Sequence, residues 1–141
     1  MMKTPAHLWI IGVVSLLWNA GGAYDYVMTQ TKNVAYLERL TDAQKAFLDA
    51  GPMWFEAAWA VGIWFSVIGS LLLLLRSRVA GAAFSLSLFG LIASSVYSFG
   101  IADRTGLEMS AAQLGFTVAI FVVLVVLWVY ARAMTRRGVL R

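Results

Sequence analysis

The segment AAQLGFTVAIFVVLVVLWVYA, which spans Ala111–Ala131, decides the fold class. It contains no charged side chain, and a helix needs about 20 such residues to cross a bilayer. Three further segments of similar length contain no Lys or Arg, namely Leu8–Met28, Pro52–Leu75 and Val79–Ile101. A lone span in lipid must satisfy its own backbone hydrogen bonds, so helices are expected. The sequence therefore predicts an all-α membrane protein, a four-helix transmembrane bundle that forms one integral membrane domain over residues 1–141.

Composition supports this assignment and excludes several classes of site. Of the 141 residues, 61% are hydrophobic and only 13% charged, whereas a soluble domain is about half apolar and about a quarter charged. The chain has no Cys, which excludes disulfides, thiolate metal sites and thiol chemistry. Its single histidine, His7, excludes a haem held by two histidines. No cofactor and no metal site are expected.

Charges are distributed unevenly between the two ends of the predicted bundle. One end holds both termini and the loop between the second and third spans, and it carries no acid. The opposite half holds four bases and all seven acids. By the positive-inside rule we expect both termini to be cytoplasmic, in a bacterial inner (plasma) membrane. The net charge of +4 is then an orientation signal and a contact for anionic lipid head groups, and no nucleic-acid partner is expected. The bases at the terminal end are Lys3, Arg76, Arg78, Arg132, Arg136, Arg137 and Arg141.

The first span has an alternative interpretation as a cleaved signal peptide. Lys3, the apolar core from Leu8 to Trp18 and the small residues 20–23 fit that pattern. The apolar run continues beyond Ala23, which favours a retained span. With cleavage, three spans would remain and the new N-terminus would lie outside.

Loop 29–51 is the only long connection between the predicted spans. Thr41 and Gln44 have the spacing of a capping box, and Ser110 and Gln113 repeat it before the fourth span. We expect a short amphipathic helical segment in loop 29–51, lying on the outer membrane face or capping the bundle. A lid that covers the helix ends is favoured over a substrate gate.

Small side chains recur on the second and third spans at helical spacing. Such stripes let helix backbones approach closely in lipid, so these spans are expected to form a tight antiparallel pair. The fourth span is rich in large aliphatic residues, which predicts a peripheral position. The expected packing residues are Gly62, Ser66, Gly69, Ala83, Ser87, Gly90 and Ser94.

Polar residues from all four spans are predicted to lie at similar depth in the outer leaflet. Carboxylates within spans are costly and usually face a bundle interior or a wet cavity. A ligand-binding pocket is one interpretation, second to purely structural roles for these residues, and if its carboxylates are close together one would take up a proton near neutral pH. The favoured structural roles are Asp25 as a cap, the tyrosines as interface residues, and Arg104 as the partner of an acid. The candidate ligand-binding residues are Asn19, Asp25, Tyr26, Glu56, Trp59, Tyr97 and Gln113.

The stretch WNAGGAYDY, residues 18–26, resembles a family of small four-span bacterial inner-membrane proteins. The shared pattern is W-N-x-x-G-x-x-D-Y, followed here by Thr29, Thr31 and Tyr36-Leu37. The resemblance extends to Gly69-Ser70, somewhat over a third of the chain. It implies the four-span fold and carries no established catalytic residues. Small multidrug-resistance transporters also have an acid in the first of four spans, but theirs lies at mid-membrane, which disfavours that assignment.

Three functions are consistent with the sequence. The first, which the sequence favours, is an accessory or scaffolding protein that packs against itself, as a homo-oligomer, or against a larger membrane complex. The second is binding or transport of a small polar or cationic ligand in an outward-facing pocket around Asp25 and Glu56. The third is a membrane enzyme that uses these acids as acid and base. The sequence lacks a nucleophile–base or metal-ligand set, so an enzyme is not expected.

Overall fold

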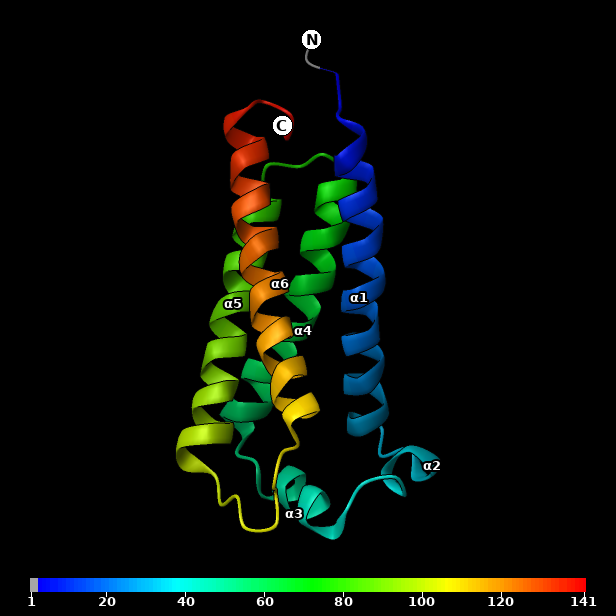
Figure 1. Cartoon of the computed structure of the whole chain (residues 1–141), viewed down its shortest axis with the longest axis vertical. Helices are drawn as coiled ribbons and strands as arrows, with labels where there is room; N and C mark the ends of the chain where they lie inside the picture. The colour runs from blue at the N-terminus through cyan, green and yellow to red at the C-terminus, as the bar shows by residue number, and fades with distance from the viewer. Residues whose placement is uncertain (1–2) are drawn as a thin grey trace.

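The computed structural model describes residues 3–141 and consists of four long helices with two short ones at one end (Figure 1). The long helices are α1 (Ala6–Gln30), α4 (Met53–Leu74), α5 (Ala80–Val96) and α6 (Ala111–Arg136). A π-helical turn, η1 (Tyr97–Ile101), continues α5. Each of these four units is long and apolar enough to cross a membrane. The predicted all-α class and the four spans are confirmed, and the molecule fits a multi-pass membrane protein in a lipid bilayer.

The long loop lies at the end of the bundle opposite the two termini (Figure 1). It contains α2 (Val34–Leu37) and α3 (Asp42–Ala50). The capping box before α3 is confirmed, because the Thr41 side chain accepts from the Gln44 N–H and the Gln44 side chain accepts from the Thr41 N–H. The capping box of Ser110 and Gln113 at the start of α6 is confirmed in the same way.

Helices α4 and α5 pack backbone against backbone. A Cβ atom added to Gly90 would lie 2.5 Å from the Gly62 nitrogen and 2.5 Å from the Ala58 oxygen. The Ser87 hydroxyl donates to the Gly62 carbonyl at 2.5 Å. Small residues therefore allow the two helices to approach this closely. The close contact holds α4 and α5 in place, and both helices line the candidate site.

The main hydrophobic core lies near the terminal end of the bundle. Phe84 of α5 and Leu73 of α4 are fully buried there, together with Leu8 of α1. The expectation of a peripheral fourth span is wrong for the half of α6 nearer the termini. Buried residues recur there at spacings of three and four, which places them on one face of the helix. They are Leu124, Leu127, Ala131 and Met134.

The C-terminal residues fold back onto the same core. Gly138 has a positive φ of 71° and turns the chain after α6, and Val139 and Leu140 are buried. The Arg141 N–H donates to the Arg76 carbonyl at 2.8 Å, and its own carbonyl accepts from the Arg78 N–H at 3.0 Å. The tail therefore closes the terminal end of the bundle.

Around the bundle, the neighbouring helices follow the order α1, α4, α5, α6. The seam between α6 and α1 differs from the other three in how closely the helices approach. There the two helices meet through side chains rather than by close backbone packing. Near the terminal end, His7 Nδ1 lies 2.6 Å from the Tyr130 hydroxyl. Further out, the rings of Trp18 and Phe116 have centroids 5.6 Å apart. The space behind this seam is the candidate site.

Candidate functional site

A cavity of about 700 Å³ lies between the four long helices in the half of the bundle away from the termini. The large side chains in its wall are apolar, and Trp18, Phe116 and the backbone at Gly21 are partly exposed on the α1–α6 side. The cavity therefore communicates with the exterior along the seam. Its lining comprises Leu17, Trp18, Asn19, Gly21, Gly22 and Asp25 of α1, Trp59, Gly62, Ile63 and Ser66 of α4, Ser87, Leu91 and Ser94 of α5, and Phe116, Ile120 and Leu124 of α6.

Asn19 provides a buried amide at the inner part of this cavity. Its side chain is only 9% exposed, and Nδ2 donates to the Ser66 carbonyl at 3.1 Å and to Ser70 Oγ at 2.9 Å. Ser15 Oγ donates to the same Ser70 oxygen at 3.0 Å. Because both Nδ2 hydrogens are used, Oδ1 is the part of the amide left to accept a hydrogen bond in the cavity. This network fixes the Asn19 side chain against α4.

Asp25 lies at the mouth of the cavity furthest from the termini. Its carboxylate accepts a hydrogen bond from the Tyr36 hydroxyl of α2, and its backbone carbonyl accepts from Thr29 Oγ1 at 2.8 Å. Asp25 also lines a shallower depression beneath α2 and α3, whose wall includes Leu40 and Phe47. The two short helices thus form a cover over the outer end, which is bonded to α1 through Asp25.

Trp59 separates the cavity from its neighbouring depressions and contributes to the wall of each. Tyr26 packs edge-on against Trp59 with a centroid distance of 5.0 Å and also against Trp64 at 6.0 Å. On the other side, Phe55 stacks on Trp59 at 6.3 Å. Tyr26 therefore supports a wall of the cavity and does not line it.

Besides Tyr26, three more of the predicted site residues lie outside this cavity. Glu56 is exposed and lines a separate depression with Lys32 and Lys45. Tyr97 is buried against Phe55, and its hydroxyl donates to the Ala50 carbonyl at 3.3 Å. Gln113 is occupied in the capping box of α6. Equal depth in the membrane does not imply a shared face, because the rotation of each helix decides where its side chains point.

Arg104 does not bridge the carboxylates. Its guanidinium donates to the Ser98 carbonyl at 2.7 Å and lies 4.6 Å from the centroid of the Phe99 ring. The alternative prediction, that Arg104 pairs with Asp25 or Glu56, is therefore wrong. Arg104 instead closes the η1–α6 loop.

Sequence reasoning did not identify Tyr36 or the α6 residues of the cavity. The motif of residues 18–26 places four residues at helical spacing on α1, and all four line the cavity. They are Trp18, Asn19, Gly22 and Asp25. Tyr36 follows the same motif in the sequence pattern, and this association with Asp25 was the one sequence feature that pointed to their contact. The α6 residues are ordinary apolar residues, and no sequence pattern marks them.

Comparison with protein-family models, curated proteins and solved structures gives no match. The resemblance of residues 18–26 to small inner-membrane proteins therefore stays a prediction. Within residues 3–141, no three His, Asp or Glu side chains lie close enough together to hold a metal ion. The function has to be argued from the cavity.

Proposed function

We propose that the protein binds a small amphipathic ligand with a cationic or hydrogen-bond-donating end in the cavity between the four helices. The observation that carries this proposal is a cavity of about 700 Å³ with a buried amide inside it and a carboxylate at its mouth. Cavities of about 300–1,000 Å³ with a mostly apolar wall and a few polar groups are typical of small-molecule sites. This supports the binding function over a purely scaffolding one.

The chemistry of the wall selects the class of ligand. An apolar body would contact Leu91, Ile63 and Ile120. A cationic group would be attracted by the Asp25 carboxylate and by the ring face of Trp59, since cations bind favourably over indole rings. The Asn19 carbonyl would accept a hydrogen bond from a donor group placed deeper in the cavity.

A binding role also fits the separation of the two acids better than an acid–base role does. Asp25 and Glu56 line different depressions, whereas a general acid and base must both reach the reacting atoms. We propose no enzymatic activity for this pair.

We further propose that the cavity faces outward from a bacterial inner membrane. Both termini lie at the opposite end (Figure 1), and the seven bases of that end have no acid beside them in the sequence. The positive-inside rule then makes that end cytoplasmic. Cysteine accessibility in intact cells tests the orientation, because the chain has no native Cys.

The binding proposal is tested with the cation benzyltrimethylammonium and its uncharged carbon isostere, neopentylbenzene. Binding to the purified, detergent-solubilised protein is followed by tryptophan fluorescence, because Trp18 and Trp59 line the cavity. We expect the cation to bind more tightly than the isostere. Asp25→Asn should weaken the cation about tenfold, the equivalent of about 1.4 kcal/mol, and leave the isostere unchanged.

The chain offers a matched control in Glu56→Gln. This change removes the same charge from the outer end of a neighbouring helix but lies outside the cavity. Cation affinity should stay within about twofold of the unmodified protein. Equal weakening by both variants, or an unchanged affinity in Asp25→Asn, would contradict a specific role for Asp25. A second variant, Gly21→Leu, fills space where a Cβ meets nothing within 4 Å and should weaken both probes.

Association of α6 with a second copy of the chain is a second candidate function. Ala111, Gly115 and Ala119 recur every four residues on the first turns of α6, and Ala111–Phe116 are all exposed. Small residues at this spacing are typical of close helix pairs in membranes. An accessory role by self-association would use this face.

The self-association is tested with Ala112→Cys, a unique thiol in this chain. Oxidation in the membrane should give a disulfide-linked dimer, and the added change Gly115→Leu should abolish it because the helices can no longer approach. The control is Leu114→Cys, because this exposed position lies on the side of α6 opposite Ala112. Equal cross-linking at both positions would indicate random collision in the bilayer.

A further inference from the structure

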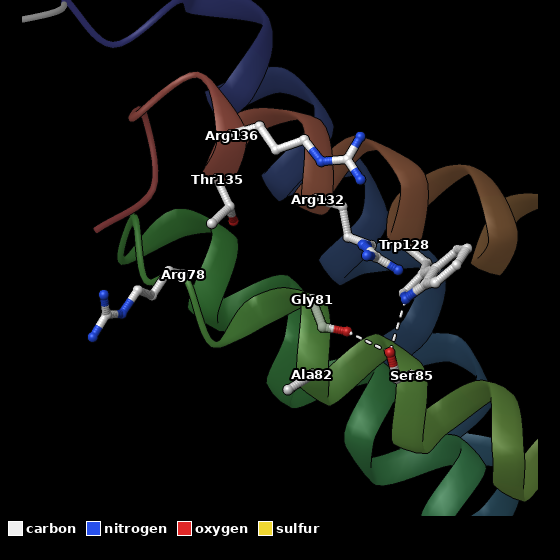
Figure 2. A pocket seen from close by; sticks show the side chains of 8 residues that line it. All are labelled: Arg78, Gly81, Ala82, Ser85, Trp128, Arg132, Thr135 and Arg136. Carbon is white, nitrogen blue, oxygen red and sulfur yellow. Dashed lines mark hydrogen bonds between the residues drawn. The ribbon is translucent and has the colours of Figure 1, made fainter.

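A basic groove of about 370 Å³ lies between α5 and α6 at the terminal end of the bundle (Figure 2). Its floor is formed by small residues of α5, and a Cβ on Gly81 would already lie 3.6 Å from the Arg132 side chain. Arg132 and Arg136 extend along its α6 side towards Trp128 (Figure 2). The groove is therefore shaped by small residues on one helix and by long cations on the other. Its lining is Arg78, Gly81, Ala82, Ser85, Trp128, Arg132, Thr135 and Arg136.

Local contacts fix the wall of the groove. Trp128 Nε1 donates to Ser85 Oγ at 2.8 Å, and Ser85 Oγ donates to the Gly81 carbonyl at 2.9 Å. The Arg132 guanidinium lies 5.0 Å from the centroid of the Trp128 ring. The indole and hydroxyl hydrogens are thus used within the protein. The guanidinium groups are the donors that remain for a ligand.

No acidic side chain is available at this end to neutralise the arginines. All seven acids belong to residues 25–108 in the half of the bundle opposite the termini. Arg78 also lines the groove, with its guanidinium pointing away from the other two (Figure 2). Guanidinium groups without an internal counter-ion favour a phosphate, which they can bind through two parallel hydrogen bonds.

The surface next to the groove is apolar along both helices. On α5, Phe89 and Ile92 follow Ser85 at helical spacing and are exposed. On α6, which runs in the opposite direction, Val125 and Val118 precede Trp128 at helical spacing and are exposed. An acyl chain attached to a phosphate in the groove would lie along this surface. A soluble phosphate would make no use of it.

We propose that this groove binds the phosphate head group of an anionic phospholipid, with Arg132 and Arg136 as the phosphate ligands. The site lies at the ends of two spanning helices, with Trp128 at the level where indole rings meet head groups. Basic pockets between transmembrane helices on the cytoplasmic side bind anionic head groups by the same chemistry. The lipid is recognised by its charge and by its attachment to an apolar chain.

Native mass spectrometry of the detergent-solubilised protein tests the proposal. The probes are phosphatidylglycerol, phosphatidylcholine with matched acyl chains, and inorganic phosphate. The protein should retain phosphatidylglycerol, with clearly less phosphatidylcholine and no inorganic phosphate. The double variant R132Q/R136Q should bind phosphatidylglycerol about 30-fold more weakly, taking roughly fivefold for each arginine near an anionic lipid.

Two further variants make the result specific. R137Q/R141Q removes the same charge from the same end but not from the groove, and it should retain phosphatidylglycerol. R132K/R136K keeps the charge and should retain the preference for phosphatidylglycerol over phosphatidylcholine, even if R132Q/R136Q were to unfold. Equal loss in R132Q/R136Q and R137Q/R141Q would overturn the proposal. So would equal binding of the two lipids, retention of inorganic phosphate, or burial of the groove in a dimer.

Discussion

Gly90→Ala is the sharpest test of how the α4–α5 pair positions the cavity. The added Cβ would lie 2.5 Å from the Gly62 nitrogen and from the Ala58 oxygen. Both are backbone atoms of α4, which cannot rotate away as a side chain can. Heavy atoms in contact prefer separations of about 3.5 Å, so the two helices must move apart by about 1 Å at this point.

The expected cost follows from three contributions. Overpacking in a close-packed interior costs about 1–3 kcal/mol. The hydrogen bond from Ser87 to the Gly62 carbonyl is lost or lengthened, and such interhelical bonds contribute about 0.6 kcal/mol in membranes. Replacing a helical glycine by alanine returns about 0.5–1 kcal/mol. We therefore expect Gly90→Ala to lower the free energy of unfolding by about 2 kcal/mol, mainly through overpacking.

The assay is unfolding by increasing mole fraction of SDS in mixed micelles, followed by far-UV circular dichroism. Gly115→Ala is the control, because a Cβ there meets nothing within 4 Å. The control should be about 0.5–1 kcal/mol more stable than the unmodified protein, since alanine stays small on the α6 face proposed for self-association and the helix propensity is what changes. The reasoning is refuted if Gly90→Ala is as stable as the control. Ligand affinity should fall in Gly90→Ala as well, because Gly62, Ser66 and Ser87 line the cavity.

Three other changes have defined outcomes. Tyr36→Phe removes the hydrogen bond to the Asp25 carboxylate, so amide hydrogen exchange should accelerate in α2 and α3 and stay unchanged in α5. Gly138→Ala forces a side chain into φ 71° and should lower stability by about 1–2 kcal/mol in the SDS assay, with no change if the tail does not need this turn. Hydrogen bonds from Thr105 hold the pKa of Asp103 below its ordinary 3.8, so the loop gains stability above about pH 4 and loses it as pH falls through the lowered value. An NMR titration of the Asp103 carboxyl carbon should show that lowered midpoint, and Thr105→Ala should return it towards 3.8.

The number of spans and both capping boxes could be predicted from sequence, whereas α6 continues to Arg136, beyond the predicted end at Ala131. These features depend on local patterns: the length of an apolar run, and a Ser or Thr three residues before a Gln. The half of α6 nearer the termini was predicted less well. Its apolar residues face lipid and core alike, so composition alone does not separate Leu127, which is buried, from Val126, which is exposed.

The candidate site was predictable only where one helix face carried the information. Asn19 and Asp25 lie on one face of α1, and both line the cavity. Glu56 was expected beside them because its depth is similar. Glu56 instead lines a different depression, because Trp59 of α4 separates that depression from the cavity. Depth follows from residue counting, whereas rotation depends on how Gly62 and Gly90 lock α4 to α5.

The side-chain seam between α1 and α6 has a mechanical consequence. In the half away from the termini, the ring contact of Trp18 and Phe116 narrows the opening of the cavity on that side, and an aromatic pair contributes about 0.5–1.5 kcal/mol. The half of α6 nearer the termini is anchored by Leu127, Ala131 and Met134 in the core. Widening the seam at this level would break this aromatic contact and leave the buried core residues of α6 in place. We therefore expect an apolar ligand to enter the cavity from the lipid, along the seam between α1 and α6.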